Sequence, residues 1–321
     1  PTPTPRPVLD FTTGKAAVES DYVLQQSLSG ALTTVLDGSQ GWVRPGSHHV
    51  RFTATHLGPW AKGFGGFGQS NGDHVYDYGG VAGYGSAVTH RLTLGLAFSG
   101  SGASTSNRYE IASNRSFGGY GYGIYTLGRL RFSADIGGGS VQLDTHRDLL
   151  PTPLQAYGST QGWFLGVGSQ LQYLVPLGSA FLIPYAQLTY LHTQLGAFTE
   201  SGAGLLNLHT GALHTNIASL TGGVRFGMDL GSHSLTWIPW VELGGTGNAG
   251  TLHAGVLQTL PGLGNASAFC RCLVAPKASL DTGAGLTVRG QGPWSVKVAY
   301  SGQYAPRVHF NTFSLLANYR W

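Results

Sequence analysis

The chain closes with NTFSLLANYRW, residues 311–321, where apolar residues recur at every second position. One face of this stretch carries Phe313, Leu315, Ala317, Tyr319 and Trp321. The other face carries Ser314, Leu316, Asn318 and Arg320, three of which are polar. A period of two is the period of a β-strand with one apolar and one polar face. Since chain ends are usually frayed and polar, a strand here indicates that the last residues help to build the fold.

The composition favours alternation along the whole chain. Charged residues make up 10% of the sequence, whereas a typical soluble domain has about 25%. Hydrophobic residues nevertheless reach only 41%, and the mean hydropathy is zero. Such averages are expected where lipid-facing and lumen-facing residues alternate. The net charge of +4 is spread along the chain, so we expect no nucleic-acid partner.

The N-terminal part contains one predicted helix. Residues 1–14 are rich in proline and predict an extended linker, and the lack of an apolar core segment there predicts a mature or truncated C-terminal piece. Residues 15–37 have a period of 3.6 and would extend about 34 Å as a helix. Their polar residues exclude contact with lipid and suit a water-filled pore; among them are Glu19, Asp21, Gln25 and Gln26.

From about residue 58 the period is two, which predicts twelve strands. We place them at 58–67, 76–89, 91–100, 117–127, 129–142, 160–175, 180–192, 216–230, 234–247, 276–290, 293–304 and 308–321. An even number of antiparallel strands can close into a barrel without a free edge. The sequence thus predicts an all-β transmembrane fold, a 12-stranded antiparallel β-barrel with an N-terminal α-helix inside its pore.

The connections alternate in length, as in outer-membrane barrels with periplasmic turns and outer loops. The short set includes THR, LGR and GQGP, and the long set is predicted to cover 99–116, 145–160, 193–217 and 248–275. Two prolines inside strands, Pro184 and Pro239, are expected near the periplasmic rim, where a lost hydrogen bond is tolerable. Aromatic residues near strand ends predict interfacial girdles. They are Trp163, Tyr173, Trp237, Trp240, Trp294, Tyr304, Tyr319 and Trp321.

A pore-sized helix, twelve amphipathic strands and a terminal aromatic resemble the C-terminal translocator β-domain of autotransporters, the type V secretion proteins of Gram-negative bacteria. The matching stretches are PWAKGFGGFG, YDYGGVAGYGSAV, IPYAQLTYLH and LLANYRW, and the resemblance covers residues 15–321. It implies three parts, namely a passenger linker at 1–14, a lumenal helix and connector at 15–57, and an outer-membrane barrel at 58–321.

The resemblance also implies function and partners. The barrel would anchor and export an N-terminal passenger across the outer membrane, and the helix would remain as plug and tether. The face formed by Phe313, Leu315, Ala317, Tyr319 and Trp321 is similar to the signal that the barrel assembly machinery reads. Outer-membrane lipid and lipopolysaccharide would surround a monomer without a cofactor.

Charged residues in the predicted strands would point into the lumen. They are Asp135, Arg225, Asp229, Glu242, Asp281, Arg289, Lys297 and Arg320. Two interpretations stay open, since these groups could pair with one another and hold helix groups such as Glu19 and Asp21, or they could simply line a hydrated lumen.

Other functions are weaker alternatives. A free-standing porin-like channel would begin its first strand at once, without a helix before it. A barrel enzyme would need catalytic groups on outer loops, and Asp144, His146 and Asp148 are the best candidates there, but a solvated loop is the plainer interpretation, and we expect no enzyme. Cys270 and Cys272 are two residues apart, which favours a strained disulfide or two thiols over a metal site.

Overall fold

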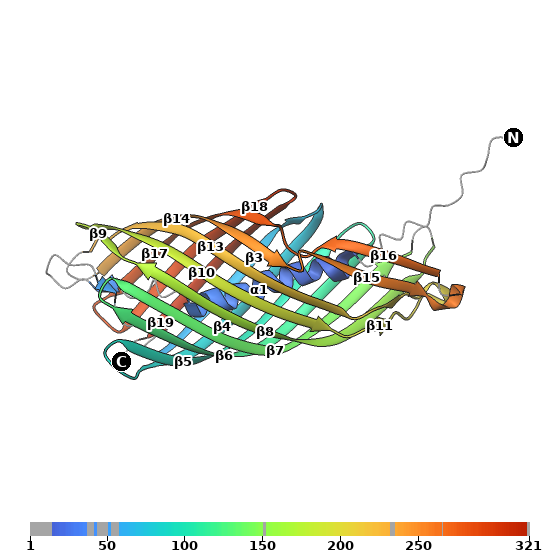
Figure 1. The fold of residues 1–321 in the computed structure, drawn as a ribbon, viewed down its shortest axis with the longest axis horizontal. Coiled ribbons are helices and arrows are strands. Elements are labelled where there is room, and N and C mark those ends of the chain that lie inside the picture. The colour runs from blue at the N-terminus through green and yellow to red at the C-terminus, as the bar shows by residue number, and fades with distance from the viewer. Residues whose placement is uncertain are drawn as a thin grey trace.

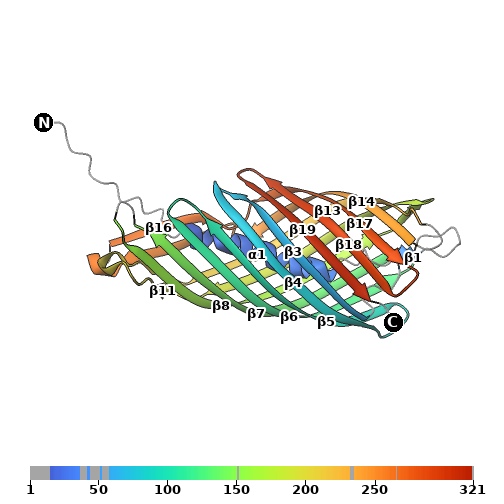
Figure 2. The ribbon, with the colours of Figure 1, turned by 180° about the vertical axis from the view of Figure 1, so that it is seen from behind.

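The computed structural model describes residues 15–36, 42–43, 51–52, 58–149, 152–231, 235–264 and 266–319. Figure 1 shows a long tube of tilted strands around the helix α1 (Lys15–Leu36). In the view from behind, the helix again lies inside the tube (Figure 2). A barrel around a helix, as the sequence predicts, is therefore confirmed.

Within these ranges, twelve long strands form the wall. In order along the chain they are β3 (Gly58–Ser70), β4 (Asp73–Ala87), β5 (Leu92–Ser106), β6 (Glu110–Leu127), β7 (Leu130–Asp148), β8 (Gln155–Tyr173), β10 (Ala180–Leu195), β13 (Leu213–Met228), β14 (Leu235–Gly250), β17 (Ala278–Gly290), β18 (Trp294–Ala305) and β19 (Val308–Tyr319). Each pairs antiparallel with its neighbours.

Two pairings close the wall. The last strand, β19, pairs with the first, β3, from Val308 opposite Ser70 to Asn318 opposite Trp60. Across a longer connection, β10 pairs with β13 along the whole of both strands. The C-terminal stretch with the alternating pattern thus forms β19, one of the two strands whose pairing closes the barrel.

The predicted strand bounds are wrong at one end of the barrel. The stretches 99–116 and 145–160, expected as long loops, are mostly strand, and only 107–109 and 149–154 connect β5 to β6 and β7 to β8. A tilted strand needs about 9–11 residues to cross a membrane, whereas β7 and β8 have 19 each. The extra residues continue the wall beyond the apolar zone, where the outward face needs no apolar side chains, so hydropathy does not reveal them.

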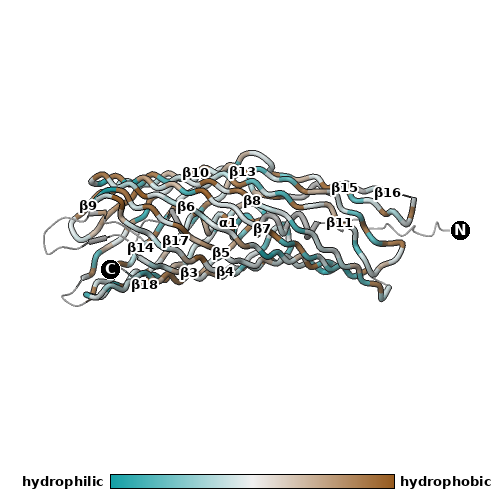
Figure 3. Tube along the Cα trace, turned by 90° about the horizontal axis from the view of Figure 1, so that it is seen from below, coloured by the Kyte–Doolittle hydropathy of each residue, from teal (hydrophilic) through white to brown (hydrophobic). Residues whose placement is uncertain are grey.

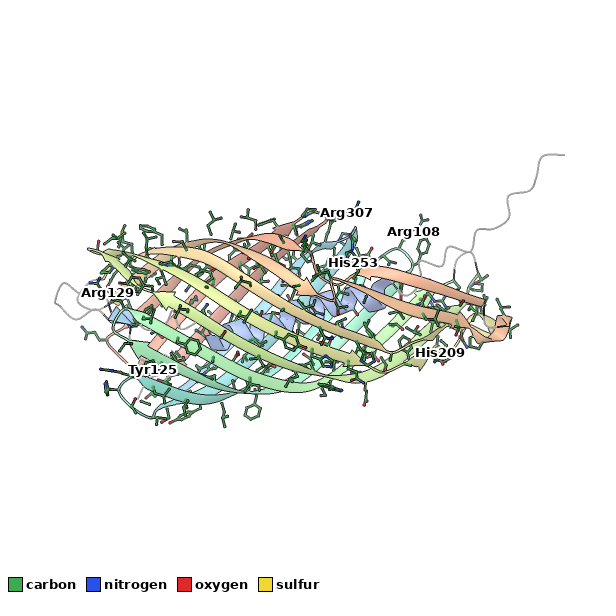
Figure 4. All side chains as sticks on the ribbon, in the orientation of Figure 1. Arg108, Tyr125, Arg129, His209, His253 and Arg307 are labelled. Atoms are coloured by element: carbon green, nitrogen blue, oxygen red, sulfur yellow. The ribbon has the colours of Figure 1, made fainter. Side chains whose placement is uncertain are left out.

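The end with the longer connections carries a small second sheet, β11-β12-β15-β16. Its strands are β11 (Phe198–Thr199), β12 (His209–Thr210), β15 (His253–Leu260) and β16 (Ala266–Leu273), with short helices η2 (Gly204–Leu206) and η3 (Pro261–Leu263). Figure 4 shows His209, His253 and Arg108 toward this loop end, and Tyr125 and Arg129 at the opposite, turn end. The expected loop at 248–275 therefore contains a hairpin.

Side chains alternate between the outside and the lumen. Along β8, exposed Trp163, Leu165 and Val167 alternate with buried Phe164 and Gly166. The hydropathy colours alternate along the strands in the same way (Figure 3). An outward apolar band around a closed sheet is what a lipid-embedded barrel requires.

The middle of β6, residues 119–124, has its large side chains on the lumenal face. In β6, Tyr120, Tyr122 and Ile124 point into the lumen and are at most 5% exposed, while glycines face outward. The tyrosine hydroxyl groups find polar partners, because Trp60 Nε1 donates to Tyr122 Oη at 3.0 Å and Tyr120 Oη lies 3.0 Å from Ser99 Oγ. Apolarity alone therefore does not tell which face of a strand meets lipid.

Lumenal rings lie over glycines of the neighbouring strand. A Cβ atom at Gly137 would collide with the ring of Tyr120, and one at Gly95 with that of Tyr122. Likewise, Gly285 is covered by Trp240. Glycine is required at these positions because the ring occupies the space of a side chain, which explains part of the 51 glycines in the chain.

Both strand prolines lie where one neighbouring ladder is missing. Pro184 faces the gap between β8, which pairs with β10 from Tyr185 onward, and β9 (Val175–Leu177), which pairs with residues 180–182. Pro239 pairs with β17 but lies just beyond the last β13–β14 pair, at Trp240. On the side where each proline has no paired neighbour, no backbone hydrogen bond is lost because proline lacks an N–H group.

Most of the expected girdle residues face outward, including Trp163, Tyr173, Trp237, Trp294 and Tyr304. The expectation is wrong for Trp240, whose ring lies in the lumen under Arg225. Trp237 and Trp240 are three residues apart on one strand, so they must face opposite sides. Trp321 lies outside the described residues.

Among the described residues, no helix has the length and apolarity needed to cross a membrane.

The glycine–ring contacts predict a position-specific effect on stability. Gly137→Val should lower the temperature at which the folded barrel loses its compact gel mobility, because the new side chain displaces the ring of Tyr120. Gly222→Val is the matched control, since nothing lies within 4 Å of a Cβ atom there. Equal midpoints for the two variants would contradict this account.

Candidate functional site

The candidate functional site is the lumen and the helix that fills part of it. The apolar side of α1 packs against the wall formed by β4 to β8. Its side chains are Leu24, Leu28, Ala31 and Leu32, each at most 2% exposed. Their spacing of three and four residues forms one stripe on a helix. They meet lumenal apolar groups of the wall, such as Val81, Ala97 and Phe164. The helix is therefore held by packing as well as by polar contacts.

A small residue in the wall makes room for the helix. A Cβ atom at Gly166 of β8 would lie 2.8 Å from Cδ1 of Leu32. A larger residue at this position would force the end of the Leu32 side chain to move.

The polar side of α1 forms hydrogen bonds with strands on several sides of the barrel. Ser27 Oγ donates to Asp77 Oδ2 on β4 at 3.2 Å. Gln25 Nε2 donates to Thr215 Oγ1 on β13 at 3.1 Å. Gln26 Nε2 donates to Gln303 Oε1 on β18 at 2.9 Å. These contacts determine how the helix is rotated about its axis.

Two further bonds define the direction of the helix. Asn114, near the loop end of β6, donates from Nδ2 to the carbonyl oxygen of Ser20 at 2.7 Å. Lys62, near the turn end of β3, donates from Nζ to Thr34 Oγ1 at 2.8 Å. The N-terminal end of α1 therefore lies toward the loop end, in agreement with its contacts with β16 (Figure 1).

The helix is off-centre, and a cavity of about 310 Å³ remains beside it. Residues of α1 line one side, among them Ser29, Gly30 and Thr33. The opposite side comes from β10, β13, β14, β17, β18 and β19. Gln187 Nε2 reaches Thr33 Oγ1 at 3.2 Å from β10. The lumen is thus plugged by a helix that is narrower than the barrel.

Several expected lumenal charges gather on the cavity side of the wall. Arg225 donates from Nε to Glu242 Oε2 at 2.7 Å, and Tyr185 Oη donates to Glu242 Oε1 at 2.7 Å. The ring of Trp240 lies 4.7 Å from the guanidinium of Arg225 and 4.8 Å from Nζ of Lys297. A cation over an aromatic face is stabilised by the ring quadrupole. The structure therefore brings Arg225, Glu242 and Lys297 together across three strands.

The other expected lumenal residues are scattered. Asp281 accepts from Thr246 and Ser279 and borders the cavity. Asp135 is buried on β7, in register with Gly168, and Arg289 lies near the turn end of β17. Asp229 follows β13 and accepts from the N–H of Gly231 at 2.9 Å.

Some expected residues lie beyond what the structure describes. Arg320 is outside the described residues, as is the linker at 1–14. For Glu19 and Asp21 only the helical backbone is described, while Gln25 and Gln26 bond to the wall as given above.

The sequence reasoning missed Asp77 and Lys62, which both bond to the helix. Each has a signal in its strand, because Asp77 alternates with outward Tyr76 and Tyr78, and Lys62 with Ala61 and Gly63. A charged residue on the inward face of an amphipathic strand is the sequence feature that could have identified both residues.

The turn-end mouth of the barrel holds part of the connector. There β1 (Trp42–Val43) pairs with β2 (Arg51–Phe52). Phe52 is 6% exposed and packs with Leu174, Phe181, Ile183 and Ile238. The guanidinium of Arg131 lies 4.1 Å from its ring. A second contact, distinct from the helix, thus occupies this mouth.

The candidate catalytic residues lie on the outward side of β7 instead of on a loop. Asp144 accepts from Ser159 Oγ at 2.8 Å, and Asp148 accepts from Gln155 Nε2 at 3.1 Å. His146 stacks on Tyr157, with ring centroids 4.8 Å apart. Each of the three thus contacts a residue of β8.

Within the described residues, no group of three or more histidine, cysteine, aspartate or glutamate side chains could hold a metal ion. Cys270 and Cys272 belong to β16, where only the backbone is described, so the state of their sulfur atoms lies outside the described part.

Comparison with known proteins shows which family has this architecture. The autotransporter β-domain family matches residues 59–301, more than half of the chain. Among solved structures, the translocator domain of the autotransporter NalP from Neisseria meningitidis is similar, with a TM-score of 0.71, 16% identity, and 95% of this chain and 99% of that chain covered. No curated protein matches the chain.

Two further solved structures have the same fold. The transport unit of the autotransporter AIDA-I from Escherichia coli has a TM-score of 0.63 at 14% identity, and the match covers 95% of this chain and 99% of that chain. The β-domain of the Bordetella autotransporter BrkA has a TM-score of 0.62 at 15% identity, with coverage of 82% and 99%.

The packing of α1 predicts how well the plug is held. Leu28→Ala should destabilise the helix–wall contact by about 2–5 kcal/mol, because Leu28 is 1% exposed between helix and wall. Recordings from single barrels in planar bilayers should then show more frequent openings. Ser29→Ala, on the cavity side, should leave the current unchanged. Identical traces from both variants would show that this packing does not hold the plug.

Proposed function

The chain belongs to the autotransporter β-domain family, and from this premise we propose that its lumenal helix is the tether that keeps an exported passenger at the cell surface. Family membership makes the chain an outer-membrane translocator of a Gram-negative bacterium, with an attached N-terminal passenger. The tethering role of α1, the partners and the domain limits are our proposals.

The observation that carries the proposal is the direction of α1. Its N-terminal end, at Ser20, bonds near the loop end, and its C-terminal end, at Thr34, bonds near the turn end. In outer-membrane barrels the loops face the outside and the turns face the periplasm. A chain that continues upstream of Lys15 would therefore leave the lumen on the outer side. We assign 1–14 to the passenger linker, 15–57 to helix and connector, and 58–321 to the barrel.

The polar helix contacts favour a plug that stays in place after export. Ser27, Gln25 and Gln26 each bond to a different strand, so the helix cannot slide along its axis without breaking all three contacts. The wall and the helix share the burial of Leu24, Leu28 and Leu32. Such packing stabilises a resting position and opposes passage of the helix itself.

We assign no catalytic reaction to the barrel. Translocator domains of this family are typically transport units. The best candidates, Asp144, His146 and Asp148, already have partners on β8, and we interpret those contacts as support for the tall part of the wall.

We also propose that the outward face of β19 is read by the barrel assembly machinery. Phe313 and Leu315 are 53% and 54% exposed on that face, and Ala317 and Tyr319 follow in phase. An extended strand can be recognised through its backbone and alternate side chains before it pairs. In the closed barrel the same residues contact lipid. The outward face of β19 would therefore be recognised during assembly and would face lipid afterwards.

Export is tested with a reporter fused upstream of Pro1. External protease added to intact cells should remove the reporter, because the N-terminal end of α1 points outward. Deletion of 15–36 should leave barrel insertion intact but should raise the conductance, because the plug is gone. A reporter that stays in the periplasm while the barrel is inserted correctly would defeat the export proposal.

The assembly signal is tested with paired substitutions. Phe313→Ser with Leu315→Ser should slow insertion of the barrel in cells, followed as the appearance of the heat-modifiable gel band. Leu220→Ser with Val224→Ser removes similar outward apolar groups from β13, 61% and 45% exposed, and is the control. Equal delay in both pairs would point to lost lipid contact instead of a lost signal.

A further inference from the structure

The outer surface near the loop end carries basic side chains over one sector of the barrel. His309 on β19 lies opposite Gln69 on β3, which lies opposite His74 on β4. All three side chains are exposed. Because neighbouring strands are about 4.8 Å apart, the two histidines are about 10 Å from each other on the same face.

Arg307 lies directly above this row, at the tip of the β18–β19 hairpin (Figure 4). It has a positive φ of 65°, and its carbonyl oxygen accepts from the N–H of Asn71 at 2.8 Å. That bond joins the β18–β19 turn to the β3–β4 turn. The backbone of Arg307 is therefore held against the β3–β4 turn, two residues before His309 and close to the start of β4, which carries His74.

The sector continues onto β5 and β6. Arg115 is exposed on the outward face of β6, and Arg108 is exposed in the connection between β5 and β6, 5.5 Å from the ring of Tyr109. We call His74, Arg108, Arg115, Arg307 and His309 the basic belt.

Acidic side chains on the same strands point the other way. Asp73 and Asp77 on β4 and Glu110 on β6 are lumenal and 5% exposed. Outward acids at the loop end, as far as the structure describes it, are Asp144 and Asp148 on β7, the strand next to β6. Asp144 is a diagonal neighbour of Arg115, which pairs with Gln142, and the N–H of Asp148 donates to the carbonyl oxygen of Tyr109, next to Arg108. The alternation of the strands thus separates the charges on β19, β3 and β4 and leaves the outer surface of these three strands positive at the loop end, while Arg108 and Arg115 border the two outward acids of β7.

The belt lies just above outward aromatic residues. Tyr76, 52% exposed, is two residues below His74 on β4, and Phe117, 67% exposed, is two residues below Arg115 on β6. Tyr304 lies opposite His309. Since tyrosine rings are enriched at the membrane–water interface, His74 and His309 lie at the height of lipid headgroups. On β6, exposed Ile111 lies nearer the loop end than Arg115, so Arg115 lies at the upper edge of the apolar band.

We propose that the basic belt binds the phosphate groups of lipopolysaccharide, the phosphorylated glycolipid of the outer leaflet. Guanidinium groups bind phosphate through paired charged hydrogen bonds. The belt follows the aromatic band around a convex wall, which suits lipid headgroups better than an acidic polypeptide seated in a pocket. The inference rests on the outer-membrane location and not on the export route.

The test uses purified, folded barrel in neutral detergent and measures binding of hexa-acylated lipid A with two phosphates. The same lipid without phosphates is the second probe. Replacement of all three arginines, as Arg108→Gln, Arg115→Gln and Arg307→Asn, should weaken binding of phosphorylated lipid A at least tenfold, because each basic group near a charged surface contributes about fivefold. Asn accepts the positive φ at position 307.

Two controls separate the belt from general charge effects. Arg91→Gln with Arg129→Gln removes exposed basic groups at the turn end and should leave binding unchanged. Replacement of the three belt arginines by lysine should retain most of the affinity, and heat-modifiable mobility confirms folding in every case. The proposal fails if dephosphorylated lipid A binds equally well or if the belt variant binds like the unmodified chain. It also fails if polyglutamate binds the belt while lipid A does not. The reporter assay is independent of all these outcomes.

Discussion

The structure depends on the pairing of β19 with β3, because this ladder turns an open sheet into a closed one. In lipid no water is available for unpaired N–H and C=O groups, so a free edge would be very costly. Eleven residues of each strand, from Val308 to Asn318 and from Trp60 to Ser70, pair across this seam. The seam joins parts of the chain that are about 250 residues apart, so the wall is complete only when the last strand has been added.

Closure of the sheet creates a lumen, and the width of this lumen determines which side chains are needed to fill it. A barrel of this size is too wide for its own side chains to fill. Here α1 fills one side through Leu24, Leu28 and Leu32, and rings such as Tyr120 and Trp240 lie flat over glycines. The remaining space becomes a cavity with Arg225, Glu242 and Lys297 on its far wall. The interior is thus packed on the side of the helix and contains a cavity on the other side, and it is not an open channel.

The separation of charge follows from the same geometry. Because successive residues of a strand face opposite sides, neighbours in sequence serve different environments. Asp73 is buried in the lumen while His74 faces outward, and Glu110 is buried beside outward Ile111. One strand can therefore contribute an acid to the interior and a base to the membrane surface. At the loop end, Arg147 and Glu200 form a buried ion pair, with Nη2 and Oε2 2.5 Å apart, so these two charges neutralise each other inside the barrel.

The sequence alone determined the alternation, the number of membrane-crossing strands, the helix at 15–37 and the closing strand, because period and composition are local properties. It also placed Arg225, Glu242 and Lys297 on inward faces. Tertiary structure decided the rest. The wall extends far beyond the apolar zone at β7 and β8, since water on the outward face removes the hydropathy signal there. Trp240 turned inward, and Asp77 and Lys62 became helix partners, because register and helix position bring residues together that are distant in sequence. Which wall the helix packs against depends on the shape of the whole lumen, and no local pattern carries that information.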